Sequence, residues 1–183
     1  MASYHLSVKT GGKGNAYPHA AYIAREDKYA RKKEADLEHK EAGNMPAWAV
    51  HNPAEFWKAA DTFERANGCT YREIEIALPR ELNPEQRLAL VRDFVRQELG
   101  DRHAYQFAIH NPDAAIDGGE QPHAHIMFSE RCSDGTDRDP PHYFKRANSK
   151  DPARGGAKKV RFGETPAERR DYLTGQRERW AAL

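Results

Sequence analysis

Hydrophobic and polar residues alternate in two short segments near the middle of the chain, residues 105–110 and 123–128. The connection between them is rich in Pro, Asp and Gly and is too polar to belong to a core. Alternation with a period of two predicts strands, and such a connection predicts that they pair as an antiparallel hairpin. Each strand then has an apolar face and a histidine face. If both apolar faces cover one core, His110, His123 and His125 lie together on the opposite face of the sheet.

The same pattern predicts two further strands, at residues 3–9 and 69–79. Helices are predicted where apolar residues recur at a spacing of three to four, or where Ala, Arg, Lys and Glu dominate. Three of the helix starts carry an Asn or Thr N-cap followed by Pro and an acidic residue. The predicted helices cover residues 20–40, 53–67 and 84–100, a short segment within 142–148, and a terminal segment that begins after Thr165.

This order of elements favours the α+β class in a single domain of 183 residues. We expect a central, mostly antiparallel sheet with helices packed on it. We further expect the helices to cover one face, which would leave the histidine face free for chemistry.

Charge is unevenly distributed along the chain although the net charge is only +1. Residues 1–33 and 131–183 each carry an excess of five positive charges, whereas residues 34–130 carry an excess of nine negative charges. Within the last third, residues 145–161 hold seven Lys or Arg and one acid. With the neighbouring aromatics, residues 143–162 suggest a flexible basic arm that follows phosphates and stacks on bases, although a solvated loop has the same composition.

Two features indicate where the protein works. The sequence has no apolar segment long enough to span a membrane, and its N-terminus lacks the apolar stretch of a signal peptide. The two cysteines, Cys69 and Cys132, do not have metal-type spacing and favour reduced thiols over a disulfide. A cytoplasmic location without membrane insertion is therefore expected.

Three imidazoles on one surface suggest a divalent metal ion with open coordination positions for water or substrate. A His-x-His pair alone is a weak signal, and the third histidine on the neighbouring strand strengthens it. Glu73 and Glu75 share the polar side of the 69–79 strand, where either could accept the imidazole N–H that is not used for metal. Glu75 is preferred because it is nearer the strand centre, but spacing leaves both open, and both also fit a plain solvent-facing surface.

A metal near a basic segment indicates a phosphoryl substrate, because the ion offsets developing charge while Lys and Arg hold the backbone. The nucleophile is then either water or a tyrosine whose proton is removed.

Several motifs resemble one known family in the same order over nearly the whole chain. HLSVKTGGKG, AAYIARE and DKYAR are followed by FERANG, EIEIALP, AIH…PHAHIMFSER and FKR…GGAKK. Together they are similar to MobA/MobL relaxases, which mobilise IncQ-type plasmids. The pair at His123 and His125, preceded by His110, resembles the HUH signature of single-strand endonucleases.

The resemblance implies an HUH relaxase-like domain over 1–183 that nicks and rejoins one DNA strand at a plasmid origin of transfer. A tyrosine would attack a phosphodiester with metal assistance, giving a 5′-phosphotyrosyl link and a free 3′-OH. The nucleophile falls on Tyr22 in preference to Tyr29. The metal ligands fall on the three histidines, and the supporting carboxylate falls on Glu75 or Glu73.

The resemblance also implies partners. The DNA-holding residues fall on Lys145, Arg146, Lys158 and Lys159. The metal is expected to be Mn or Mg, with Zn, Co or Ni as further candidates. A monomer is expected to act on single-stranded origin-of-transfer DNA together with accessory relaxosome proteins and a type IV coupling and secretion system.

Three other interpretations stay open. A rolling-circle replication-initiation nuclease shares the HUH chemistry but places its tyrosine after the histidine pair, where Tyr143 and Tyr172 are the candidates. A metallonuclease that uses water needs no tyrosine. A non-catalytic single-stranded DNA-binding module is the least favoured.

Overall fold

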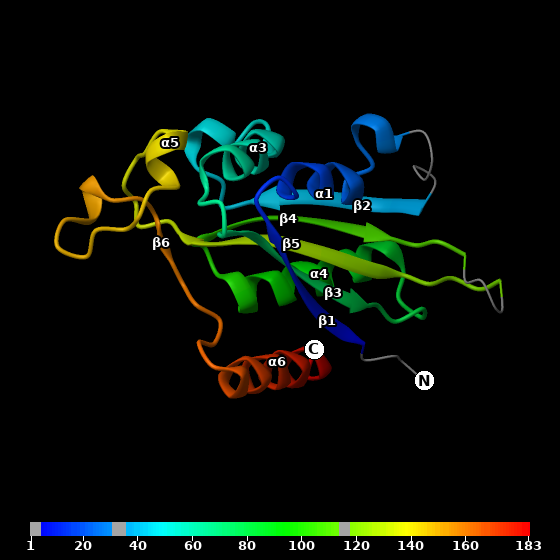
Figure 1. Cartoon of the computed structure of the whole chain (residues 1–183). Coiled ribbons are helices and arrows are strands. Elements are labelled where there is room, and N and C mark those ends of the chain that lie inside the picture. The colour runs from blue at the N-terminus through cyan, green and yellow to red at the C-terminus, as the bar shows by residue number, and fades with distance from the viewer. Residues whose placement is uncertain (1–4, 31–35, 114–117) are drawn as a thin grey trace.

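The computed structural model describes residues 5–30, 36–113 and 118–183. Its centre is a six-stranded sheet in the order β1-β3-β5-β4-β2, with β6 paired to the end of β5, as Figure 1 shows. Every pair of neighbouring strands is antiparallel. The strands are β1 (Leu6–Gly12), β2 (Leu37–Gly43), β3 (Cys69–Ala77), β4 (His103–His110), β5 (His123–Cys132) and β6 (Lys158–Lys159). The predicted fold class and the central hairpin are confirmed.

Helices pack on both faces of this sheet, so the expectation of one free face is wrong. In Figure 1, α1, α3 and α5 lie on one side of the sheet and α4 and α6 lie on the other. The helices are α1 (Ala16–Ile23), α3 (Pro53–Phe63), α4 (Pro84–Leu99), α5 (Pro140–Tyr143) and α6 (Pro166–Ala181). The described residues also form three short 3-10 turns: η1 (Asp27–Tyr29), η3 (Ala47–Ala49) and η4 (Pro152–Arg154). Among the described residues, no helix is both long and apolar enough to cross a bilayer.

Two hydrophobic cores result, one on each face. The face under α4 and α6 carries the large alternating residues, including Ile74, Phe107 and Ile126. The histidine face is also covered: the small residues Ala104 and Ala108, with the larger Met127, are fully buried under α1 and α3. Alanine at alternate positions of a strand gives a weak hydrophobic signal, so the sequence pattern did not reveal this second core.

A continuous helix over 20–40 is also wrong. The helix α1 ends at Ile23, Arg25 adopts a left-handed conformation (φ 54°), and the chain then forms β2. Most of β2 (LEHKEAG) has low strand propensity, but pairing with β4 supplies its backbone hydrogen bonds. Tertiary pairing therefore overrides a local helix preference. Residues 31–35 of the predicted helix lie outside the described residues.

Most of the capped helix starts lie where the sequence placed them. Capping boxes at Asn83 and Thr165 begin α4 and α6. The helix α3 begins at Pro53 as predicted but ends at Phe63, before residue 67, and the side chain of Asn52 makes no capping bond. The first strand continues to Gly12, beyond the predicted end at residue 9, although residues 3 and 4 are not described. The short helix predicted within 142–148 lies earlier, at α5.

The basic arm is folded against the domain rather than flexible. The buried guanidinium of Arg131 forms two hydrogen bonds with Glu64 (3.0 and 2.9 Å) and donates to the carbonyls of Phe144, Lys145 and Ala157. Burial alone would raise the pKa of Glu64, but the contacts with Arg131 outweigh it and lower that pKa, so the pair is ionic.

Replacing Arg131 with Gln is expected to destabilise the domain by about 3–5 kcal/mol, because Glu64 would remain buried without its guanidinium partner. The matched exposed change, Arg161→Gln, breaks the surface pair with Glu164 and should cost less than about 1 kcal/mol. Urea unfolding midpoints at neutral pH measure both. Equal midpoints for the two variants would contradict a structural role for the buried pair.

Candidate metal centre

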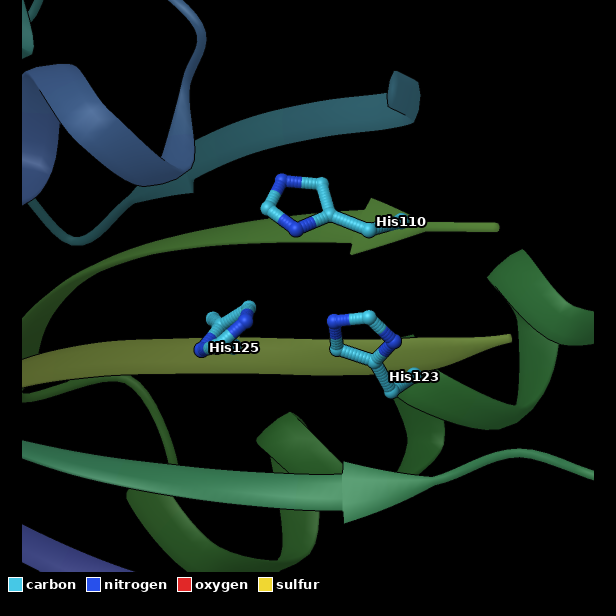
Figure 2. A group of neighbouring side chains, drawn as sticks. All are labelled: His110, His123 and His125. Atoms are coloured by element: carbon cyan, nitrogen blue, oxygen red, sulfur yellow. The ribbon is translucent and has the colours of Figure 1, made fainter. Parts of the chain in front are cut away.

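Three histidines meet at one end of the β4–β5 hairpin. His110 lies at the end of β4 directly opposite His123 at the start of β5, and His125 follows two residues later on the same face. One ligand nitrogen from each ring lies within 4.8 Å of the other two. The ring centroids are 5.1–5.4 Å apart, and Figure 2 shows the three rings facing a common space.

Hydrogen bonds fix which nitrogen of each ring is available. Nε2 of His110 donates to the carbonyl of Ile23 (2.7 Å), and Nδ1 of His123 donates to the carbonyl of Gln121 (3.0 Å). Nδ1 of His125 donates to Oε1 of Glu73 (2.7 Å). A neutral imidazole has one N–H and one lone pair, so the lone pairs are left on Nδ1 of His110 and on Nε2 of the other two.

This donor set fits a divalent metal. Metal-bound histidines must be neutral, and they normally donate the other N–H to a carbonyl or carboxylate, as all three do here. Burial lowers the pKa of His110 to about 4 and also lowers the pKa of His123, so both rings are neutral at physiological pH. Three imidazoles leave coordination positions open.

A cavity adjoins the centre on the side of β1 and β3. It has a volume of about 710 Å³ and is lined by His123, Glu75, Arg80 and Gln121, among others. A substrate can therefore approach His123 from solvent without displacing a helix.

Glu73, rather than the preferred Glu75, forms the hydrogen bond with one of the three histidines, His125. Glu73 is 1% exposed, and its two carboxylate oxygens contact the rings of His125 and His19. Glu75 pairs with Lys9 (3.2 Å) and stays 4.0 Å from Nδ1 of His125. Burial would raise the pKa of Glu73, but the hydrogen bond from His125 and the proximity of His19 lower it, so the carboxylate is ionised. The position of each residue within the strand did not indicate this difference, because Glu73 also contacts His19 of α1. The sequence pattern did not place that helix over β3.

Tyr22 lies on α1 and is 37% exposed. The guanidinium of Arg25 lies over its ring (4.9 Å from carbon ζ to the centroid), and Arg25 also donates to Nδ1 of His110 (3.3 Å). Tyr29 meets the Tyr22 ring edge-on at 5.4 Å. The structure therefore links Tyr22 to the histidine centre through one shared neighbour, Arg25.

Sequence reasoning missed two residues of this site. His19 precedes Tyr22 by three positions, a helical spacing that could have placed both rings side by side (6.3 Å between centroids). Arg25 gave no such signal, because its contacts depend on a left-handed φ and on Asp36, which follows the undescribed segment.

The two late tyrosines lie away from the centre. Tyr143 is 5% exposed and packs against Phe56, and burial raises its pKa to about 12. Tyr172 belongs to α6 on the opposite face of the sheet, where burial also raises its pKa to about 12. Neither phenol is available beside the three histidines.

The predicted DNA-holding residues Lys145, Arg146, Lys158 and Lys159 line one groove of about 500 Å³, termed here the basic groove. It lies at the β6 end of the sheet (Figure 1). Arg131, which pairs with Lys159, lies eight positions after His123 on β5. Along an extended strand this is about 26 Å. Tyr143 and Phe144 are buried, so the expectation that they stack on bases is wrong.

Comparison with known proteins places these features in a family. The MobA/MobL family model matches residues 15–183. The chain belongs to the MobA/MobL family. It is 73% identical to the 43 kDa relaxation protein of Salmonella typhimurium over 183 residues, which cover all of this chain and 49% of that protein. It is 44% identical to Mobilization protein A of Escherichia coli over 185 residues, covering 99% of this chain and 24% of that protein.

A solved structure supports the fold. The structure titled "Molecular Basis of Vancomycin Resistance Transfer in Staphylococcus aureus" superposes with a TM-score of 0.60 at 20% identity, covering 96% of this chain and 87% of that one. The resemblance found in the motifs is thereby confirmed at the level of family and fold. The chain spans about half the length of the Salmonella relative and about a quarter of the Escherichia one.

Glu73→Gln is expected to weaken Mn²⁺ binding by about 10–100-fold, because the His125 N–H would lose its charged acceptor. Glu75→Gln, the matched change two residues away, should have a smaller effect. Calorimetric titration of the DNA-free protein measures both affinities. A larger loss for Glu75→Gln would restore the preference drawn from the sequence.

Proposed function

We propose that this domain nicks and rejoins one DNA strand at a plasmid origin of transfer by tyrosine transesterification. The observation that carries the proposal is the cluster of three imidazoles, linked through Arg25 to the exposed Tyr22, in a member of the MobA/MobL family. The names of the two relatives, a relaxation protein and a mobilization protein, support the same activity.

The reaction assigns a role to each part of the site. The phenol of Tyr22 loses its proton and its oxygen attacks the scissile phosphorus. A Tyr–O–P bond forms, the P–O3′ bond breaks, and the departing 3′ oxygen takes up a proton, so that one O–H bond is lost and one is gained. A divalent ion, Mn or Mg first and Zn, Co or Ni as further candidates, would offset the charge that develops on the phosphoryl oxygens. Glu73 and the carbonyls of Ile23 and Gln121 hold the three imidazoles in the ligating tautomer. Because one phosphoester replaces another, the strand can be resealed without ATP.

The proposal extends to partners. The substrate is single-stranded origin-of-transfer DNA. The protein acts as a monomer in the cytoplasm, together with accessory relaxosome proteins and a type IV coupling and secretion system. A replication-initiation nuclease with its tyrosine after the histidine pair is disfavoured by the buried Tyr143 and by the position of Tyr172 on the opposite face. A metallonuclease that uses water would cleave the DNA without forming a covalent adduct.

Tyr22→Phe should abolish a covalent protein–oligonucleotide adduct, because the phenolic oxygen is the atom that bonds to phosphorus. The variant should still bind the oligonucleotide, since the ring and the basic groove remain. Incubation with Mn²⁺ and single-stranded origin DNA, followed by denaturing electrophoresis and peptide mapping, gives the result. Tyr29→Phe is the matched control and should keep the adduct. Cleavage without any adduct would indicate water as nucleophile, and an adduct at Tyr143 or Tyr172 would contradict the assignment.

Arg146→Ala and Lys158→Ala should each reduce the slope of log affinity against log salt by about 1, with a similar loss on all DNA sequences, because they contact phosphates. Lys159→Ala should have less effect, since Lys159 already pairs with Glu64 (3.3 Å). Arg96 is 75% exposed on α4, on the other face, and serves as control. Fluorescence anisotropy across a salt series measures the slopes, and an equal change for Arg96→Ala would remove the special role of the basic groove.

A further inference from the structure

Arg25 contacts both Tyr22 and the three-histidine centre, although nothing in the sequence pattern indicated that it belongs to the site. Its side chain is 4% exposed. Nε and one terminal nitrogen donate to the two oxygens of Asp36 (3.0 and 3.1 Å), and the other terminal nitrogen donates to the carbonyl of Tyr22 (2.8 Å). The terminal nitrogen that donates to Asp36 also lies 3.3 Å from Nδ1 of His110. The guanidinium lies over the Tyr22 ring.

The contact with His110 conflicts with metal binding. Nε2–H of His110 is already given to Ile23, so Nδ1 carries the one lone pair of the ring. That lone pair can accept an N–H from Arg25 or bind a metal ion, but not both. A cation at this distance also repels a dication electrostatically.

We propose that Arg25 is a positioning residue that couples metal loading to the placement of Tyr22, a proposal that rests on the proposed function. Without metal, Arg25 holds His110 and the Tyr22 ring together. With Nδ1 of His110 engaged by a metal ion, the N–H of Arg25 would give up its contact with His110, while Asp36 would keep the guanidinium in place beside Tyr22. Arg25 therefore lowers the affinity of the site for metal, and it also holds Tyr22, the nucleophile, in position.

This arrangement predicts effects of opposite sign when Arg25 is replaced. Removing the competing N–H and the positive charge should tighten metal binding. Removing the guanidinium from the Tyr22 ring and carbonyl should slow strand cleavage at saturating metal. A residue that served only to stabilise the fold would lower both properties together.

The test is Arg25→Gln, measured without DNA by calorimetric titration with Mn²⁺ and with DNA by single-turnover cleavage at saturating Mn²⁺. We expect about tenfold tighter Mn²⁺ binding, the equivalent of one hydrogen bond to a charged group, and cleavage slower by about tenfold or more. Arg25→Lys keeps the charge but not the planar fork, and should recover the weaker metal binding more than the cleavage rate.

Two controls separate other causes. Arg87 is another buried arginine, 2% exposed and paired with Glu38 (3.0 and 2.6 Å), and Arg87→Gln should lower stability without tightening Mn²⁺ binding. The double change Arg25→Gln with Asp36→Asn should keep the tighter binding, which excludes attraction of the metal ion by the negative charge of Asp36.

Unchanged or weaker Mn²⁺ binding by Arg25→Gln, or loss of the gain in the double variant, would overturn the coupling. Failure of the wild type to form an adduct, with the metal titrations behaving as expected, would instead overturn the proposed function and leave the competition at His110 standing.

Discussion

The register of the β4–β5 pair is the constraint on which the rest of the structure depends. It sets His110 opposite His123 and Ala108 opposite His125. A slip of one residue would turn the histidines of one strand toward α4 and would turn its large apolar residues toward the face that holds the histidines. The same register places Ala104, Ala108 and Met127 beneath α1 and α3. The hydrophobic core and the candidate metal centre therefore arise from one alternation and cannot be changed independently.

Helix α1 converts this sheet surface into a site. Its N-terminus is capped from α3 by Asp61, whose carboxylate accepts the backbone N–H groups of Gly14, Ala16 and Tyr17. At its other end, the carbonyl of Ile23 lacks a partner within the helix and is satisfied by Nε2–H of His110. A bond that completes the helix thus also fixes the tautomer of a candidate ligand. The helix that carries Tyr22 and the strand that carries His110 order each other.

The sequence predicted those parts of the molecule that have a strong local signal. Alternation in the hairpin brought out the three histidines, and the caps at Asn83 and Thr165 located two helices. It failed where distant segments decide the outcome. The strand β2 forms because β4 offers its free edge, and Glu73 is buried because α1 delivers His19. Arg25 could not be inferred at all, since its neighbours Asp36 and His110 are brought to it by the chain reversal at a left-handed residue.

Two buried carboxylates show why one end of the sheet is structural and the other suits a metal ion. Glu64 is matched by the permanent charges of Arg131 and Lys159, so its negative charge is balanced within the fold. Glu73 is equally buried but is held by two imidazoles, His19 and His125, whose charge is not permanent. Lys9 is shared with Glu75 and is largely exposed. The charge of Glu73 is therefore only partly balanced by protein groups, and a cation bound at the neighbouring histidines would complete the balance. A buried carboxylate therefore has a different effect at each end of the sheet. Glu64 anchors the basic arm, whereas Glu73 would attract a metal ion to the neighbouring histidines.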